Sequence, residues 1–301
     1  MKKHFFLLAA IVCLCFSSCK KEKIAIAGSG WSDIAIVDKK TGMIEWKHTL
    51  DAGDECNDIE VTPDGHVLYA YSKGAKLITR NYETIWDYKA KENEEIHTAT
   101  RLKEGGYMIA VCGEPARIVE LDPKGNPMKE FSFPTLIFDI NNQFRQVAKT
   151  DDGTYLVPLI EKHKVLQLSP EGRIAGTFFV GYDLFSVKPL ENDYVLVSCG
   201  KDGLFLEMDL ARRGMTEIND PLTLTTNFRN VTDKITGGSL LYVAEIFLYE
   251  NGNKLIANSN MHSIDKSQPL LIEIDKNNEI IWSLPFNRQI KNITAVYSFF
   301  E

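Results

Sequence analysis

A unit of about 42 residues repeats along the chain, and this repeat constrains the fold more than any other feature. In each unit a turn containing Gly, Asp or Asn precedes an apolar run, as at Asp64-Gly65 before residues 67–70. A second apolar run follows, and its equivalent positions are 42, 42, 47, 40 and 66 residues apart: Val37, Thr79, Leu121, Leu168, Met208 and Ile274. A period near 42, divided into short strands, is typical of β-propeller blades.

The apolar runs have the composition of strands covered on both faces. Residues 67–71 and 195–197 are continuously apolar, as expected where each sheet packs between two neighbours. Helical periodicity is absent over any stretch of about 12 residues, which argues against an α/β fold. We therefore predict an all-β chain, a single closed β-propeller of six four-stranded blades over residues 24–301.

The 66-residue step leaves room for a seventh blade. Residues 219–238 contain few apolar runs, so we interpret them as a long loop that forms a lid or rim over the channel mouth. A connection packed on the side of the blade, or a short helix, remains the alternative.

The two ends of the repeat region predict how the ring closes. Residues 24–27 align with the second strand of a blade, whereas residues 292–299 align with a first, innermost strand. The C-terminal strand is therefore expected to complete the N-terminal blade, which removes an exposed sheet edge. An aromatic residue marks a further strand of most units: Trp46, Trp86, Phe131, Phe178 and Trp282.

The N-terminal segment has the pattern of a bacterial lipoprotein signal. Lys2 and Lys3 precede an apolar run over residues 5–16, which is too short for a mature transmembrane helix. Ser17 and Ser18 then lead to Cys19, the predicted lipidation site. We expect residues 1–18 to be a signal peptide and residues 19–23 a lipid-anchored tether. An ordinary secretory signal is the alternative, and the bacterial cell envelope, on its periplasmic side, is the expected location.

The charge balance limits the classes of partner. The formal net charge is −7 at pH 7, with 34 basic and 41 acidic residues, and removal of Lys2 and Lys3 makes it more negative. This balance does not suggest a basic face for nucleic acid. We expect a monomer that contacts the membrane through its lipid anchor only.

One segment carries a motif of a known repeat class. Asp38-Lys39-Lys40-Thr41-Gly42-Met43-Ile44-Glu45-Trp46 resembles the repeat of quinoprotein-type (PQQ-like) propellers, with weaker echoes at residues 122–125 and 275–282. The resemblance implies that Thr41-Gly42 forms a turn and that Trp46 docks between blades. Quinone-dependent members have a vicinal cysteine pair and usually eight blades. This chain has no adjacent cysteines and is too short for eight such blades, so we expect no cofactor.

A weaker resemblance is to arylsulfotransferase-like propellers. It rests on residues 56–65, which end in Pro63-Asp64-Gly65, and on residues 97–102, which begin with His97. In that class such segments lead into blades, and the match is short enough to be general to propellers.

Candidate binding residues lie in loops that enter the innermost strands, where we expect the channel mouth. His97 is the best catalytic candidate because Glu94 and Glu95 precede it, and a neighbouring carboxylate would raise its pKa toward neutrality. A hydrogen-bonded loop histidine is the alternative. Arginines could clamp an anion or form salt bridges, and Trp31 could stack on a ring or pack between blades. The predicted ligand-binding residues are Trp31, Asn57, Asp58, His97, Arg117, Arg145, Asp183 and Arg229.

The remaining cysteines give no metal motif. Cys56, Cys112 and Cys199 are 56 and 87 residues apart, and buried free thiols are the expected state. A composite site with His163 and His262 would need several loops to converge, so no metal is predicted.

Three functions are compatible with these residues. The first is an accessory lipoprotein, not an enzyme, that binds a small molecule, a glycan or an envelope protein at the polar channel mouth. The second is a transferase, lyase or hydrolase with His97 as acid–base and an arginine as anion clamp. The third is a scaffold in an envelope assembly. The fold alone does not separate them.

Overall fold

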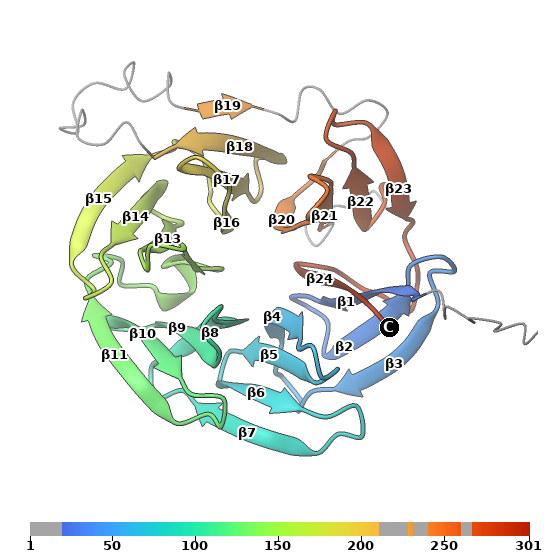
Figure 1. Cartoon of the computed structure of the whole chain (residues 1–301), viewed down its shortest axis with the longest axis horizontal. Helices are drawn as coiled ribbons and strands as arrows, with labels where there is room; N and C mark the ends of the chain where they lie inside the picture. The colour runs from blue at the N-terminus through green and yellow to red at the C-terminus, as the bar shows by residue number, and fades with distance from the viewer. Residues whose placement is uncertain (1–19, 211–227, 231–239, 260–266) are drawn as a thin grey trace, which may run out of the picture.

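The computed structural model describes residues 20–210, 228–230, 240–259 and 267–301. Its strands form six four-stranded antiparallel sheets arranged as a ring of blades (Figure 1). The predicted six-bladed, all-β propeller is therefore confirmed. One 3-10 turn, η1 (Ile140–Asn142), is the helical element of the described residues. No helix in this part of the chain is long and apolar enough to cross a membrane.

The strands of the first three blades are the most regular. Blade one contains β24 (Ala295–Phe300), β1 (Glu22–Ala27), β2 (Asp33–Asp38) and β3 (Ile44–Thr49). Blade two contains β4 (Cys56–Val61), β5 (Val67–Tyr71), β6 (Gly74–Ile78) and β7 (Thr84–Lys89). Blade three contains β8 (Glu95–Arg101), β9 (Tyr107–Cys112), β10 (Ala116–Leu121) and β11 (Pro127–Phe133).

The last three blades include some short strands. Blade four contains β12 (Ala148–Lys149), β13 (Tyr155–Leu159), β14 (Lys164–Leu168) and β15 (Ile174–Phe179). Blade five contains β16 (Ser186–Pro189), β17 (Tyr194–Cys199), β18 (Leu204–Asp209) and β19 (Phe228–Asn230). Blade six contains β20 (Val243–Leu248), β21 (Lys254–Asn258), β22 (Leu271–Ile274) and β23 (Ile280–Leu284).

The ring closes through the C-terminal strand, as predicted. Strand β24 pairs with β1 over six residue pairs, from Glu22 with Phe300 to Ala27 with Ala295. Strand β1 continues into β2 and β3, so blade one joins both ends of the described chain. Because its innermost strand is supplied by β24, both edges of β1 are hydrogen-bonded.

The core is a ring of six apolar clusters, one at each junction between neighbouring blades. Blades two and three, for example, meet through Leu68, Leu77 and Trp86 on one side and Ile109 and Val119 on the other. The innermost, second and third strands are buried on both faces at most positions, which explains their continuous apolar runs. The fourth strands alternate between covered and exposed residues because their outer edge meets solvent.

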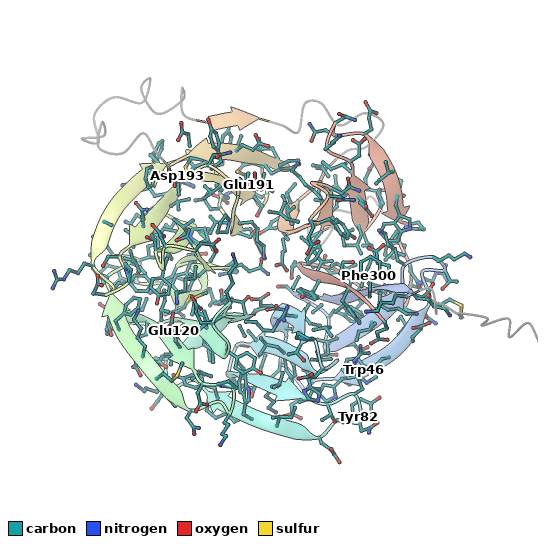
Figure 2. The ribbon with its side chains drawn as sticks, viewed as in Figure 1. Trp46, Tyr82, Glu120, Glu191, Asp193 and Phe300 are labelled. Carbon is teal, nitrogen blue, oxygen red and sulfur yellow. The ribbon has the colours of Figure 1, made fainter. Side chains whose placement is uncertain are left out.

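Turns from one blade dock on the aromatic residue of the previous blade. Gly125 has a φ of +86°, and a Cβ placed there would lie 2.6 Å from Cγ of Trp86. Gly172 has the same relation to the ring of Phe131. In blade one, Nε1 of Trp46 donates a hydrogen bond to the carbonyl of Arg80, and Figure 2 shows Trp46 with Tyr82 near the outer edge. The turn before Trp46 is held by Asp38, whose carboxylate accepts from Thr41.

The long segment before blade six differs from its prediction. Residues 228–230 form β19, which pairs with β18 as the outermost strand of blade five (Figure 1). The interpretation of residues 219–238 as a lid over the channel mouth is therefore wrong for residues 228–230. The other residues of that segment lie outside the described part of the chain, as do Cys19 and the signal peptide.

The ring has two faces, which we call the entry face and the exit face. The entry face carries the loops that lead into the innermost strands, such as residues 90–94 and 134–146. The exit face carries the loops that join first to second strands, such as residues 102–106 and 150–154. Residues 20–21 also lie at the exit face, where Lys21 pairs with Glu301 through two backbone hydrogen bonds.

Candidate functional site

A cavity of about 420 Å³ occupies the centre of the propeller. All six blades contribute to its wall, because each innermost strand turns alternate side chains toward the axis. The lining includes residues 102–104 and 150–151, which belong to loops of the exit face. The cavity therefore lies toward the exit face, whereas we had expected a site at the entry face.

Two buried carboxylates face each other deep in this cavity. One amide nitrogen, Nε2 of Gln146, lies 3.2 Å from Oδ1 of Asp58 and 2.9 Å from Oε2 of Glu245. Burial, followed by the nearby charge of Glu245, raises the pKa of Asp58 well above its ordinary value. Asp58 therefore keeps its proton to a higher pH than an exposed aspartate does.

Lys188 forms an ion pair with the buried carboxylate of Glu245. Its Nζ lies 2.6 Å from Oε1 of Glu245, and the backbone N–H of Val296 donates to Oε2 of the same carboxylate at 2.8 Å. Burial disfavours the charged amine, yet the carboxylates of Glu245 and Asp58 more than offset this, so the pKa of Lys188 is raised. Lys188 therefore stays charged inside the cavity.

Arg101 and Lys149 extend the ring of cations. Nε of Arg101 donates to Oε1 of Glu60 at 2.6 Å, and Nη2 donates to the hydroxyl of Tyr297 at 2.7 Å. Lys149 on the next blade forms an ion pair of 2.9 Å with Glu120. Strands β8, β12 and β16 thus place one cation each on three consecutive blades around the cavity.

The buried carboxylates in the cavity have all their oxygens hydrogen-bonded, whereas the cations keep donors without an acceptor among the described residues. Every carboxylate oxygen of Asp58, Glu60 and Glu245 accepts at least one hydrogen bond from within the protein. The described residues leave Nη1 of Arg101 without an acceptor, and the ammonium groups of Lys149 and Lys188 each face one carboxylate oxygen only. Because an ammonium has three donors, these cations keep unused charged donors, while Glu104 and Asp151 add two exposed carboxylates at the exit-face end of the lining.

The predicted catalytic residue has a different environment from the one expected. His97 is buried, and Nε2 lies 3.1 Å from Oε2 of Glu95. Burial dominates over the pull of Glu95 and lowers the pKa of His97 to about 4. Glu95 acts in the raising direction, as expected, but the expectation of a pKa near neutrality is wrong because burial has the larger effect. Nδ1 is buried without a partner among the described residues.

Of the predicted ligand-binding residues whose side chains the structure describes, Asp58 alone lines the central cavity. Trp31 is buried in the cluster between blades six and one, which matches the packing alternative. Asn57 donates from Nδ2 to the carbonyl of Ile96 on the next blade.

The predicted charged residues outside the cavity are held mostly by internal contacts. Arg117 is held by Glu94 and Glu130, and Asp183 pairs with Lys201 and His163. Arg145 donates to the carbonyl of Phe144. Arg229 belongs to β19, three strands outward from the channel.

The thiols do not form a metal site. Cys56, Cys112 and Cys199 are free and buried, in agreement with the expectation. His163 contacts the backbone carbonyl of Tyr182, and His262 lies outside the described residues. The described residues contain no group of three or more side chains arranged to hold a metal ion.

Sequence reasoning missed most of the cavity lining. The sequence does contain a sign of this lining, because charged residues interrupt the mostly apolar innermost strands: Glu60, Arg101, Lys188 and Glu245. Charged residues are rarely buried unless paired, so a charge inside such a run marks either a partner or a polar channel.

Comparisons with known proteins agree with this fold. A family model described as Mal s 1 allergenic protein-like matches residues 30–279. The crystal structure of a protein of unknown function from Bacteroides caccae is 33% identical with a TM-score of 0.84, and the match covers 93% of this chain and 99% of that one. No curated protein matches the sequence.

More distant structures share the fold alone. A catalytically inactive virginiamycin B lyase from Staphylococcus aureus, with quinupristin, is 12% identical with a TM-score of 0.58 over 95% of this chain and 94% of that one. A streptogramin B lyase is 10% identical with a TM-score of 0.57, over 89% and 81% respectively. The family model and the Bacteroides caccae protein each cover most of the chain, and this chain therefore belongs to the Mal s 1 allergenic protein-like family.

Proposed function

We propose that this chain is an exported, lipid-anchored envelope protein that binds a small anionic molecule in its central cavity without transforming it. The observation that carries the proposal is the surplus of charged donors on Arg101, Lys149 and Lys188. An anion with carboxylate or phosphate oxygens would accept these unused hydrogen bonds, and charge-assisted bonds of this kind are strong. The cavity volume of about 420 Å³ suits a small ligand.

The internal carboxylates favour binding of an anion over binding of a cation. Glu60 and Glu245 hold Arg101 and Lys188 in fixed positions, so these cations lose little freedom when a ligand arrives. A cationic ligand that entered the deep part of the cavity would instead have to displace Arg101 or Lys188 from a buried carboxylate, whereas Glu104 and Asp151 lie at the exposed exit-face end. That exchange would leave a charge unpaired, which is costly.

Isothermal titration calorimetry tests this proposal directly. The probes are citrate, inorganic phosphate, putrescine and glucose, with the mature chain carrying Cys19→Ser. We expect saturable binding of at least one anion and none of putrescine or glucose. Arg101→Gln should weaken anion binding by about tenfold or more, because hydrogen bonds to charged groups contribute about 1.5–3 kcal/mol.

A matched control separates the site from general charge. Arg173→Gln removes the same charge from an exposed turn on the outer part of blade four and should leave affinity unchanged. Equal loss in both variants, or tight binding of putrescine, would contradict the proposal.

The enzymatic alternative has weaker support. A transferase, lyase or hydrolase would need His97 to exchange protons with a substrate near neutral pH. A buried histidine whose pKa is lowered to about 4 is neutral there and contacts Glu95. The likeness to lyases concerns the fold only, at 10–12% identity. An activity screen in which His97→Gln abolished turnover while preserving the melting temperature would favour this alternative.

A further inference from the structure

The loop between blades three and four exposes two large apolar side chains on the entry face. Leu136 is 77% exposed and Phe138 is 87% exposed, the highest values among the large hydrophobic residues of the described chain. Thr135 precedes the pair and Ile137 lies between its two members. Both are buried, with only 7% and 4% of their surface exposed. The loop therefore alternates like a strand, with one side packed on the protein and the other side open.

The packed side of this loop is firmly attached. The buried side chain of Gln143 donates from Nε2 to the carbonyls of Ile137 and Gly113, both at 2.9 Å. The N–H of Gly113 donates back to Oε1 of Gln143 at 2.9 Å. Asp139 caps η1 through the N–H of Asn141. Leu136 and Phe138 are thus presented on a support tied to two blades.

Presenting these side chains carries a conformational cost. Leu136 has a φ of +56°, in the left-handed region that residues other than glycine, asparagine and aspartate rarely adopt. A polar or glycine residue would occupy this exposed position more favourably, since the leucine gains no burial there. Aromatic side chains that fill a pocket of the partner are typical of the central contacts of protein interfaces, and Phe138 is the aromatic residue of this pair.

Three exposed acidic residues and one partly exposed lysine, Lys162, lie in the loops of the entry face around the pair. Glu114, next to Gly113, and Glu161, whose N–H is bound by the carbonyl of Asn142, are both exposed and have no cationic partner among the described residues. Asp139 is likewise exposed and accepts only from Asn141 and Asn142. A partner that covers the apolar pair would therefore carry a basic rim.

We propose that Leu136 and Phe138 form a docking knob for an envelope protein that presents an apolar pocket with a basic rim. A phospholipid bilayer fits less well, because its headgroups are neutral or anionic and would meet the acidic rim. Residues 20–21 lie at the opposite, exit face, so an anchor at Cys19 would also direct the knob away from the membrane. That last step rests on the proposed lipid anchor, whereas the charge argument does not.

Site-specific photocrosslinking in the native host tests the knob in the full-length chain. Phe138 is replaced by p-benzoylphenylalanine, and the same residue at Met43, 67% exposed on the exit face, is the control. We expect one discrete adduct from position 138, with the crosslink mapped to a peptide of apolar and basic residues. Leu136→Ser and Glu161→Lys should each lower its yield by at least about tenfold, the change that corresponds to about 1.4 kcal/mol.

Flotation of the unlipidated Cys19→Ser chain with vesicles of phosphatidylethanolamine and phosphatidylglycerol completes the test. No binding is expected, whether or not Cys19 is the true anchor. Vesicle binding that depends on Phe138, adducts with lipid or only with a second copy of the chain, or no adduct beyond the Met43 control would each overturn the proposal. Anion binding in the cavity, measured separately, would be unaffected by any of these outcomes.

Discussion

The protonated side chain of Asp58 is expected to make the free energy of unfolding fall as pH rises. Replacing Asp58 with asparagine should remove this pH dependence. In the folded chain, burial and the charge of Glu245 raise the pKa of Asp58 well above its ordinary value. In the unfolded chain the pKa returns to about 3.9. Between these two values the folded state binds one more proton than the unfolded state, so the free energy of unfolding falls with increasing pH.

The size of this effect follows from the proton linkage. One proton corresponds to about 1.4 kcal/mol for each pH unit, and this is the largest slope with which the wild type can lose stability between the two pKa values. Asparagine has a similar shape and no charge to bury, and its oxygen can still accept from the N–H of Ile59 or Ala99. The variant should therefore match or fall below the wild type in acid and exceed it in stability at higher pH.

Urea denaturation followed by tryptophan fluorescence at pH 5, 6, 7 and 8 measures this difference. His97 contributes a slope of opposite sign below about pH 6.5, so the quantity to compare is variant minus wild type at each pH. Asp51→Asn, at an exposed residue of the entry face outside the buried pair, is the control for the loss of one carboxylate. A difference for Asp58→Asn that stays constant with pH would refute the reasoning about the buried pair.

Four further changes test other parts of the structure. Gly125→Ala should destabilise by about 1–3 kcal/mol more than Gly53→Ala in thermal denaturation, because both have φ near +85° but only the first meets Trp86. Removal of residues 293–301 should abolish the cooperative transition seen by circular dichroism, since β1 loses its inner partner; an unchanged melting temperature would contradict the closure. Between pH 6.5 and pH 4 the unfolded histidine binds a proton and the folded His97, with a pKa of about 4, does not, so the wild type should lose up to about 3 kcal/mol of stability as pH falls through this range. His97→Gln should remove this loss, as measured by urea denaturation. Cys19→Ser should remove a diacylglyceryl-cysteine from the mass spectrum of the membrane fraction; a mature form that begins elsewhere would refute lipidation.

The fold could be predicted because its signals are local and repeated. Turn residues such as Asp64-Gly65 and the following apolar strands recur with a nearly constant period, and each blade follows the same rule. The outermost strand of blade five was missed because it has only three residues, 228–230, and its one aromatic residue, Phe228, lies in a segment with few apolar runs.

The site could not be predicted because it depends on packing between blades distant in sequence. Gln146 joins Asp58 to Glu245 across 88 and 99 residues of chain, and no local pattern indicates that contact. For His97 the sequence showed the neighbouring Glu95 but not the depth of burial, and burial has the larger effect on its pKa. The end of the channel that holds a cavity is likewise set by side-chain volumes on all six innermost strands.

The pairing of β24 with β1 also orders the events of folding. The two strands are separated by almost the whole described chain, so their contact has a very large sequence separation and forms only after a costly loop closure. Blade one cannot complete its sheet until the last residues are available, and until then one edge of β1 stays unpaired. A chain built this way cannot complete its ring until its last strand has been synthesised.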